Sequence, residues 1–201
     1  MSGMSGMSGM SGVSAMGGPA DDPTCAVAHG DAFLDTSDRR LVVVFASPVA
    51  SHLVHLGRHL GYATVLLDPV ESNGAFDADL VVPDAAGAGI DPSTDVVVTD
   101  HHRSELGAVL RDVLTFPARW VGVMGSPRHV GPHVAALGEL GVRQSDIERV
   151  HRPIGLNIGS RTPPEIAVAT LAGLLADRAG RPGGFAFDEG VSTADALPLS
   201  T

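Results

Sequence analysis

The chain has 201 residues, of which 44% are hydrophobic and 18% charged, so its composition is that of a globular domain and excludes a disordered chain. Its formal net charge is −10, which argues against nucleic acid as a partner. All 13 basic residues are arginines, which excludes Schiff-base lysines and lysine-dependent phosphate loops. The single cysteine, Cys25, excludes an internal disulfide and a thiolate zinc site. We expect neither a membrane span nor a secretory signal, and therefore a cytoplasmic location.

The ends of the chain differ in composition from its middle. Residues 1–38 open with four Met-Ser-Gly copies and show no hydrophobic period, which predicts a disordered, low-complexity tail. Periodicity is lost again after residue 180, so residues 181–201 are expected to form a surface tail. The predicted organisation is therefore one domain, residues 39–180, between two flexible tails.

Five short runs rich in β-branched residues predict five strands, separated by helical patterns. In chain order the strands are residues 41–45, 63–67, 80–82, 95–99 and 119–124. Four helices are predicted. The first ends at Leu60, before a capping Gly61, and the second lies near 104–114. The third ends near Leu140, and Pro132 either kinks this helix or marks its late start. The fourth runs from Pro163 to Arg178 and begins with a Thr162–Glu165 capping box.

Strands that alternate with helices in this way predict an open, parallel α/β sheet of Rossmann type, flanked by helices, with the strand order 3-2-1-4-5. Ligands bind such sheets at the carboxyl ends of the strands, beside the point where the strand order reverses. This rule selects the loops at residues 45–48, 99–105 and 124–128 as candidate binding loops before any motif is considered.

The first loop is an altered form of a dinucleotide-binding turn. Placing Ala50 in the last position of Gly-x-Gly-x-x-Gly/Ala puts Phe45 and Ser47 at the first two glycine positions. A phenylalanine does not readily adopt a positive φ, and its ring is expected to crowd the phosphate path. Asp68 stands where a ribose-binding carboxylate would lie. Ser47 and Asp68 are candidate contacts, but an NAD(P)-binding Rossmann oxidoreductase is the less favoured alternative.

The second loop carries titratable side chains at the carboxyl end of a predicted strand. Asp100 and His101 are candidate ligand contacts, because polar residues at this place point into the site in Rossmann-type sheets. His102 is adjacent to His101, so we expect only one of the two imidazoles to face inward. The alternative is a helix N-terminal turn with solvated histidines.

The third loop and a later segment add candidates for binding an anion. A Gly-Ser pair that leads into a helix offers backbone N–H groups and a hydroxyl, with an arginine nearby. The later segment is rich in small residues and is expected to line the site with its backbone. The candidates are Gly125, Ser126 and Arg128 in the third loop, and Gly155, Asn157, Gly159 and Arg161 in the later segment.

Two sets of histidines have spacings that can bind metal, but we expect no metal site. His52, His55 and His59 share one flank of the first helix, and His129 and His133 are four residues apart. The first set borders the apolar stripe of its helix, where half-buried histidines are ordinary, and no third ligand is evident for either set.

Three segments together resemble the XdhC/CoxF family, the accessory proteins of xanthine dehydrogenase and related molybdenum hydroxylases. Residues 151–167, HRPIGLNIGSRTPPEIA, are similar to the family's C-terminal motif. Residues 120–126, WVGVMGS, are similar to its aromatic-x-Gly-x-x-Gly-Ser strand and turn, and Asp68 with Pro69 matches its Asp-Pro after the second strand. The resemblance covers about residues 41–180.

The resemblance implies a non-catalytic accessory protein or chaperone that binds the molybdenum cofactor, promotes its sulfuration and helps to insert it. Gly125, Ser126 and Arg128 would hold the phosphate or the pterin edge, and Asp100 and His101 would contact the pterin. The opposite wall would be lined by Gly155, Asn157, Gly159 and Arg161. The expected partners are the large subunit of a molybdenum hydroxylase, a cysteine desulfurase, and a second copy or a paralogue of the chain.

The chain departs from the family pattern at several positions. Phe45-Ala46-Ser47 replaces a glycine turn, Val70 replaces an arginine, and Thr99-Asp100-His101 replaces Thr-His-Asp. Residues 1–40 are too short for the separate N-terminal domain of full-length members. These departures keep open a second alternative, a degenerate, non-catalytic scaffold that partners a full-length paralogue.

Overall fold

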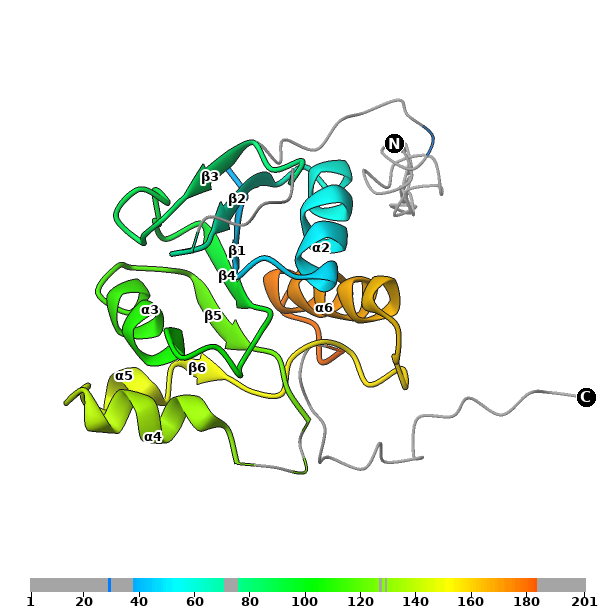
Figure 1. Ribbon diagram of the computed structural model, residues 1–201. Coiled ribbons are helices and arrows are strands. Elements are labelled where there is room, and N and C mark those ends of the chain that lie inside the picture. Colours follow the sequence, from blue (N-terminus) through cyan, green and yellow to red (C-terminus); the bar gives the residue numbers. More distant parts are fainter. Residues whose placement is uncertain (1–28, 30–37, 71–75, 127, 129, 184–201) are drawn as a thin grey trace, which may run out of the picture. The chain divides into compact units, whose positions relative to one another are not determined.

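The computed structural model describes residues 29, 38–70, 76–126, 128 and 130–183. Within these residues the chain forms one parallel sheet with the strand order β3-β2-β1-β4-β5-β6 (Figure 1). Its strands are β1 Arg40–Val44, β2 Ala63–Leu67, β3 Leu80–Val82, β4 Thr94–Val98, β5 Trp120–Val123 and β6 Val150–His151. The predicted Rossmann-like class and the order of the first five strands are confirmed, and β6 is an additional strand. The predicted tails lie almost entirely outside the described residues.

Both faces of the sheet are covered, which explains why its strands are apolar without alternation. Residues Leu41 to Val44 of β1 are all 0% exposed. Val42 and Val44 lie in one core, and Leu41 and Val43 lie in the other. Since burying an aliphatic side chain of this size contributes about 1.5–3 kcal/mol, β1 is anchored from both sides.

Two layers of helices form these cores. The helices α2 Pro48–His59 and α6 Pro163–Arg178 cover one face and lie side by side in Figure 1, in cyan and orange. The helices α3 Leu106–Val113 and α4 Pro132–Glu139 cover the other face, together with a short helix, α5 Gln144–Ile147, that was not predicted. Among the helices of the described residues, none is both long and apolar enough to cross a membrane.

Side chains cap the starts of α2 and α6; the cap of α6 was predicted, and that of α2 was not. The Ser47 hydroxyl caps α2 by accepting the N–H of Ala50 at 3.0 Å. In α6, the Glu165 carboxylate accepts the N–H of Thr162 at 3.0 Å, as a capping box requires. The helix α4 begins at Pro132, so this proline starts the helix late and does not kink it.

A buried ion cluster holds the end of α6 at the amino edge of the sheet. Asp95, the second residue of β4, is 0% exposed, and its two oxygens lie 2.6 Å from Nε of Arg119 and 2.8 Å from Nε of Arg178. The Tyr62 hydroxyl also donates to Asp95, at 3.3 Å. Since Arg178 is the last residue of α6, this cluster fixes that helix and leaves the opposite, carboxyl edge for the candidate loops.

Candidate functional site

Two cavities open where β4, β5 and β6 end. The apolar cavity has a volume of about 420 Å³, and its walls include Thr99, His101, Met124, Ser126, Ile154 and Asn157. The arginine cavity has a volume of about 610 Å³, and its walls include His101, His102, Arg103, Ser126 and Arg152. A third cavity, of about 610 Å³ beside Phe116 and Arg143, lies at the other end of α3 and contains none of the predicted site residues.

The backbone at Phe45 has a conformation that glycine usually adopts. Its φ is 69°, and its side chain is 0% exposed. The predictions that Phe45 avoids a positive φ and that its ring crowds a phosphate path are therefore wrong. The ring packs in the core, with the Arg103 guanidinium 4.8 Å from its centre. The left-handed conformation costs a non-glycine residue about 1–2 kcal/mol, and burial of the phenyl ring offsets this cost.

The first loop uses its own hydrogen-bond donors internally. The N–H of Ala46 donates to Asp68 at 2.8 Å, and the N–H of Ala50 donates to Ser47. Pro48 has no N–H. The Ser47 hydroxyl also donates to Thr99, at 2.9 Å. A dinucleotide pyrophosphate binds to such donors at this turn, and the N–H groups of Ala46 and Ala50 are already bonded within the chain.

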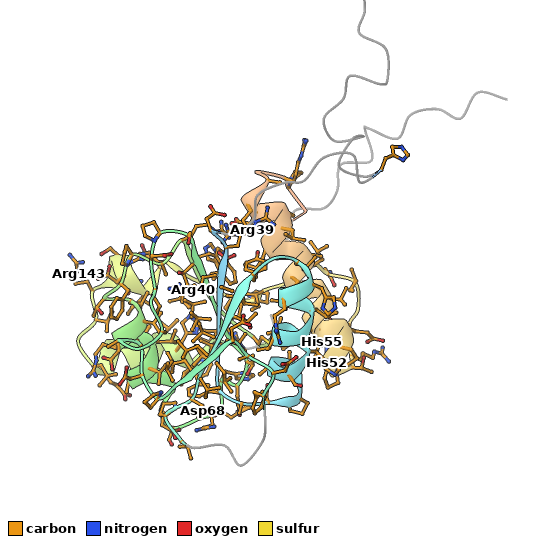
Figure 2. The ribbon with its side chains drawn as sticks, turned by 90° about the horizontal axis from the view of Figure 1, so that it is seen from above. Arg39, Arg40, His52, His55, Asp68 and Arg143 are labelled. Carbon is orange, nitrogen blue, oxygen red and sulfur yellow. The ribbon has the colours of Figure 1, made fainter. Side chains whose placement is uncertain are left out.

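Asp68 is part of the same closed arrangement. It follows β2 at the edge of the sheet away from Arg40, which begins β1 (Figure 2), and it is 6% exposed. One carboxylate oxygen accepts from Ala46; the other accepts the N–H of Val70 at 3.1 Å and pairs with Arg103 at 3.3 Å. A ribose hydroxyl could reach this carboxylate only by displacing Arg103.

In the second loop His101 has the central position. It lines both cavities, whereas His102 lines the arginine cavity alone, so the expectation that only one imidazole faces inward is wrong. Burial lowers the pKa of His101, and the charges of His102 and Arg152 lower it further. His101 is therefore neutral at pH 7, able to donate at one ring nitrogen and accept at the other. Asp100 accepts the N–H of His102 at 2.9 Å and lines neither cavity.

The third loop divides between the cavity walls and the solvent. Gly125 and Ser126 line the apolar cavity, as predicted for a binding loop. Gly125 has a φ of 157°, and a Cβ at this position would overlap the Arg152 guanidinium. Arg128 is exposed and lines neither cavity, and its N–H donates to the Ser126 hydroxyl at 3.2 Å. The absence of a side chain at Gly125 therefore leaves room for Arg152, whereas Arg128, from the loop itself, is exposed to solvent.

That neighbouring arginine, Arg152, was not among the predicted site residues. It follows β6, which consists of Val150 and His151 alone and is too short to show a β-branched run. Had β6 been recognised, the rule for carboxyl ends of parallel strands would have selected Arg152. None of the described residues that line either cavity is Asp or Glu, although the chain has 23 acidic residues. The lining is therefore suited to a neutral or anionic ligand.

The fourth predicted segment also has two parts. Asn157 and Gly159 line the apolar cavity. Gly155 has a φ of 88°, and a Cβ there would lie 3.1 Å from the backbone N of Thr170, so this glycine allows close packing on α6. Arg161 is exposed, and its N–H donates to Glu165 at 2.8 Å. Gly155 and Arg161 thus lie outside the apolar cavity and do not line it.

The predicted histidine sets do not converge with other ligands. In the described part of the chain, no group of three or more His, Cys, Asp or Glu side chains could hold a metal ion. His52 and His55 both lie on α2 (Figure 2), where His52 is half-buried and His55 is exposed. His59 Nδ1 lies 2.9 Å from the His55 carbonyl oxygen, and His129 lies outside the described residues.

Comparisons with known proteins agree with this geometry. Residues 41–174 match the XdhC Rossmann domain. The chain is 28% identical over 157 residues to YqeB, an uncharacterised protein of Escherichia coli K12, an alignment that covers 72% of this chain and 28% of YqeB. The chain is also similar to a crystal structure described as a xanthine dehydrogenase from Bacillus halodurans, with a TM-score of 0.57 and 25% sequence identity. This structural match covers 71% of this chain and 43% of the other. The chain therefore spans less than half the length of either relative.

Proposed function

The chain belongs to the XdhC family, and on that premise we propose that it is an accessory factor for a molybdenum hydroxylase of the xanthine or carbon monoxide dehydrogenase type. In this role it binds the molybdenum cofactor and aids its sulfuration or its insertion into the apo-enzyme. The observation that carries the proposal is the pair of cavities at the carboxyl edge of the sheet, whose described lining residues include no carboxylate.

The chemistry of these cavities fits the cofactor, which is a pterin with a phosphate group. A flat heterocycle needs apolar contact on its faces and donors and acceptors at its edge. The apolar cavity offers Met124 and Ile154 for the faces, and Ser126, Asn157 and neutral His101 for the edge. The arginine cavity offers positive charge to the phosphate. When bound, the cofactor supplies the molybdenum centre; these residues bind and orient it.

The chain has one cysteine, Cys25, which lies outside the described residues, and none of the described residues that line the cavities is a cysteine. Sulfur would therefore come from a partner that carries a persulfide, such as a cysteine desulfurase. The proposed role of the chain is to hold the cofactor while that partner and the hydroxylase subunit approach.

The NAD(P)-dependent alternative is disfavoured by the closed first loop. The Ala46 N–H and the Asp68 carboxylate bond to one another, and Arg103 covers the position where a ribose would lie. We expect no dinucleotide binding in this arrangement.

The test is to purify the chain from cells that produce a molybdenum hydroxylase and to assay it for bound pterin by fluorescence after oxidation. We expect pterin with the wild type, less with Asn157→Ala, and an unchanged amount with His52→Ala, since His52 lines neither cavity. Recovery of the hydroxylase large subunit without pterin would favour the scaffold alternative. Recovery of neither would refute the proposal.

A further inference from the structure

The third cavity lies away from the candidate site, where α3 and α4 end, and we call it the Phe116 cavity. Its volume of about 610 Å³ is within the range of binding pockets. Apolar side chains line much of it: Phe116 and Val142 are half-buried against the core beneath α3 and α4, and Leu140 is 44% exposed. The cavity therefore presents an apolar surface to solvent beside the core.

The charged side chains of the Phe116 cavity are mostly basic. Three arginines line it, Arg111, Arg143 and Arg149, against one carboxylate, Asp146. The whole chain, in contrast, has a formal net charge of −10. A local excess of positive charge beside an apolar surface complements a segment that carries both carboxylates and large apolar side chains.

The ion pairs of these arginines are exposed and can be exchanged. Asp146 accepts from Arg143 at 2.9 Å and lies 3.8 Å from Arg149, and Arg111 pairs with Asp112 at 2.8 Å. Arg143 is 81% exposed and points away from the sheet (Figure 2), and Arg149 is 41% exposed. Exposed pairs contribute little to stability, so a carboxylate from another segment can bind these arginines without breaking a strong pair.

The sequence contains a segment of the matching chemistry beyond the described residues. Residues 184–201 include three acidic residues and no basic residue. Two of the six phenylalanines of the chain, Phe185 and Phe187, directly precede the acidic pair Asp188 and Glu189. Apolar and acidic side chains thus follow one another within five residues, as the apolar and basic parts of the Phe116 cavity require.

This segment is too short to reach the Phe116 cavity of its own chain. The described residues end at Gly183, where a Cβ would lie 3.8 Å from Ala176 of α6. α6 covers one face of the sheet, whereas Phe116 packs on the core of the other face. Crossing two layer spacings takes about 20 Å, but the two and four residues from Gly183 to Phe185 and Phe187 span at most about 7 and 14 Å. A second copy of the chain can supply the segment.

We propose that the Phe116 cavity is a docking site for residues 185–189 of a second copy of this chain. The phenyl rings pack against Phe116 and Leu140, and the carboxylates pair with the arginines of the cavity. Reciprocal exchange of the segment between two copies closes a dimer. The inference goes beyond the proposed function and does not depend on it.

The first test measures binding of the isolated segment. A fluorescein-labelled peptide of residues 184–191 is titrated by polarisation with the full-length chain carrying Phe185→Ser and Phe187→Ser, whose own segment cannot compete. We expect saturable binding at low salt, about 10-fold weaker when the peptide carries Phe187→Ala. Arg149→Gln in the protein should weaken binding about 5-fold. The matched control is Arg58→Gln on α2, which is 42% exposed, also pairs with aspartates and should leave binding unchanged.

The second test asks whether two copies exchange the segment. In sedimentation velocity the wild type should associate as its concentration rises, whereas Leu140→Glu and the double variant Phe185→Ser with Phe187→Ser should each stay monomeric. Their equimolar mixture should form a complex, because one variant retains the segment and the other retains the cavity. If Leu140→Glu fails to fold by circular dichroism, Arg149→Gln takes its place.

Four results would overturn the proposal. These are a peptide that does not bind saturably, equal effects of Arg149→Gln and Arg58→Gln, a self-association that neither set of variants alters, and a wild type that remains monomeric at several hundred micromolar. The last result together with peptide binding would assign the cavity to an acidic segment of a different protein.

Discussion

The left-handed backbone at Phe45 predicts an unusual order of stability among its small substitutions. Phe45→Ala removes a fully buried ring and retains the strained φ of 69°. Loss of a buried phenylalanine costs about 3–5 kcal/mol, and loss of the contact with Arg103 costs about 0.5–1 kcal/mol more. Phe45→Gly loses the same contacts but relieves a strain of about 1–2 kcal/mol. We therefore expect Phe45→Gly to be more stable than Phe45→Ala by about 1 kcal/mol.

The assay is urea unfolding at 25 °C followed by circular dichroism, with Val43 as the matched control. Val43 is also fully buried, but it lies within β1, at a position that does not have a positive φ. There the order should reverse, because glycine in a strand interior is destabilising by about 0.5–1 kcal/mol relative to alanine. If Phe45→Ala equals or exceeds Phe45→Gly in unfolding free energy, the strain argument is refuted.

Four further outcomes follow from the structure. NADH at millimolar concentration should leave the fluorescence of Trp120 unchanged and give no heat in calorimetry; saturable binding would contradict the closed first loop. Asp95→Asn should destabilise the fold by about 3–5 kcal/mol in urea unfolding, because it removes the fully buried carboxylate that pairs with Arg119 and Arg178 and leaves Arg119 with Asp177 alone; a loss below 1 kcal/mol would count against the ion cluster. Gly155→Ala should cost about 2–4 kcal/mol, combining a strained φ with crowding against Thr170; an unchanged stability with weaker pterin binding would instead support a ligand-lining role. Burial and then Arg152 lower the pKa of His133 below its unfolded value of 6.5, so the stability from this group is present above pH 6.5 and is lost as pH falls. His133→Leu should therefore lose less stability between pH 7 and pH 5 than the wild type, and equal losses would refute this.

The parts of the fold that could be predicted are those with repeated local patterns. The runs Leu41–Val44 of β1 and Val96–Val98 of β4 are apolar because both faces of the sheet are covered, and that pattern identifies a central parallel strand. The start of α6 at Pro163 follows from Thr162 and Glu165. In contrast, β6 has two residues and α5 has four, and elements this short have no periodicity to detect. Their existence is decided by packing against β5 and α4.

The candidate site, like the fold, could be predicted only in part. The switch-point rule selected the edge at which both cavities open, and His101, Gly125, Ser126, Asn157 and Gly159 line them. The conformation of Phe45 could not be predicted, because local propensity opposes it and only the buried ring and the Arg103 contact compensate. Arg152 could not be predicted either, because its place depends on an undetected strand and on two glycines distant in sequence.

The strand motif Trp-x-Gly explains why the site lies on the β5 side of the crevice. A Cβ on Gly122 would overlap the Trp120 ring and would lie 2.8 Å from Cγ2 of Ile154. The absent side chain therefore leaves room for Ile154, which begins the segment that carries Asn157 and Gly159 to the apolar cavity. On the β2 side, Arg103 and Asp68 fill the corresponding space themselves. One half of the crevice is thus filled by the chain, while both cavities lie in the other half, at the ends of β4, β5 and β6.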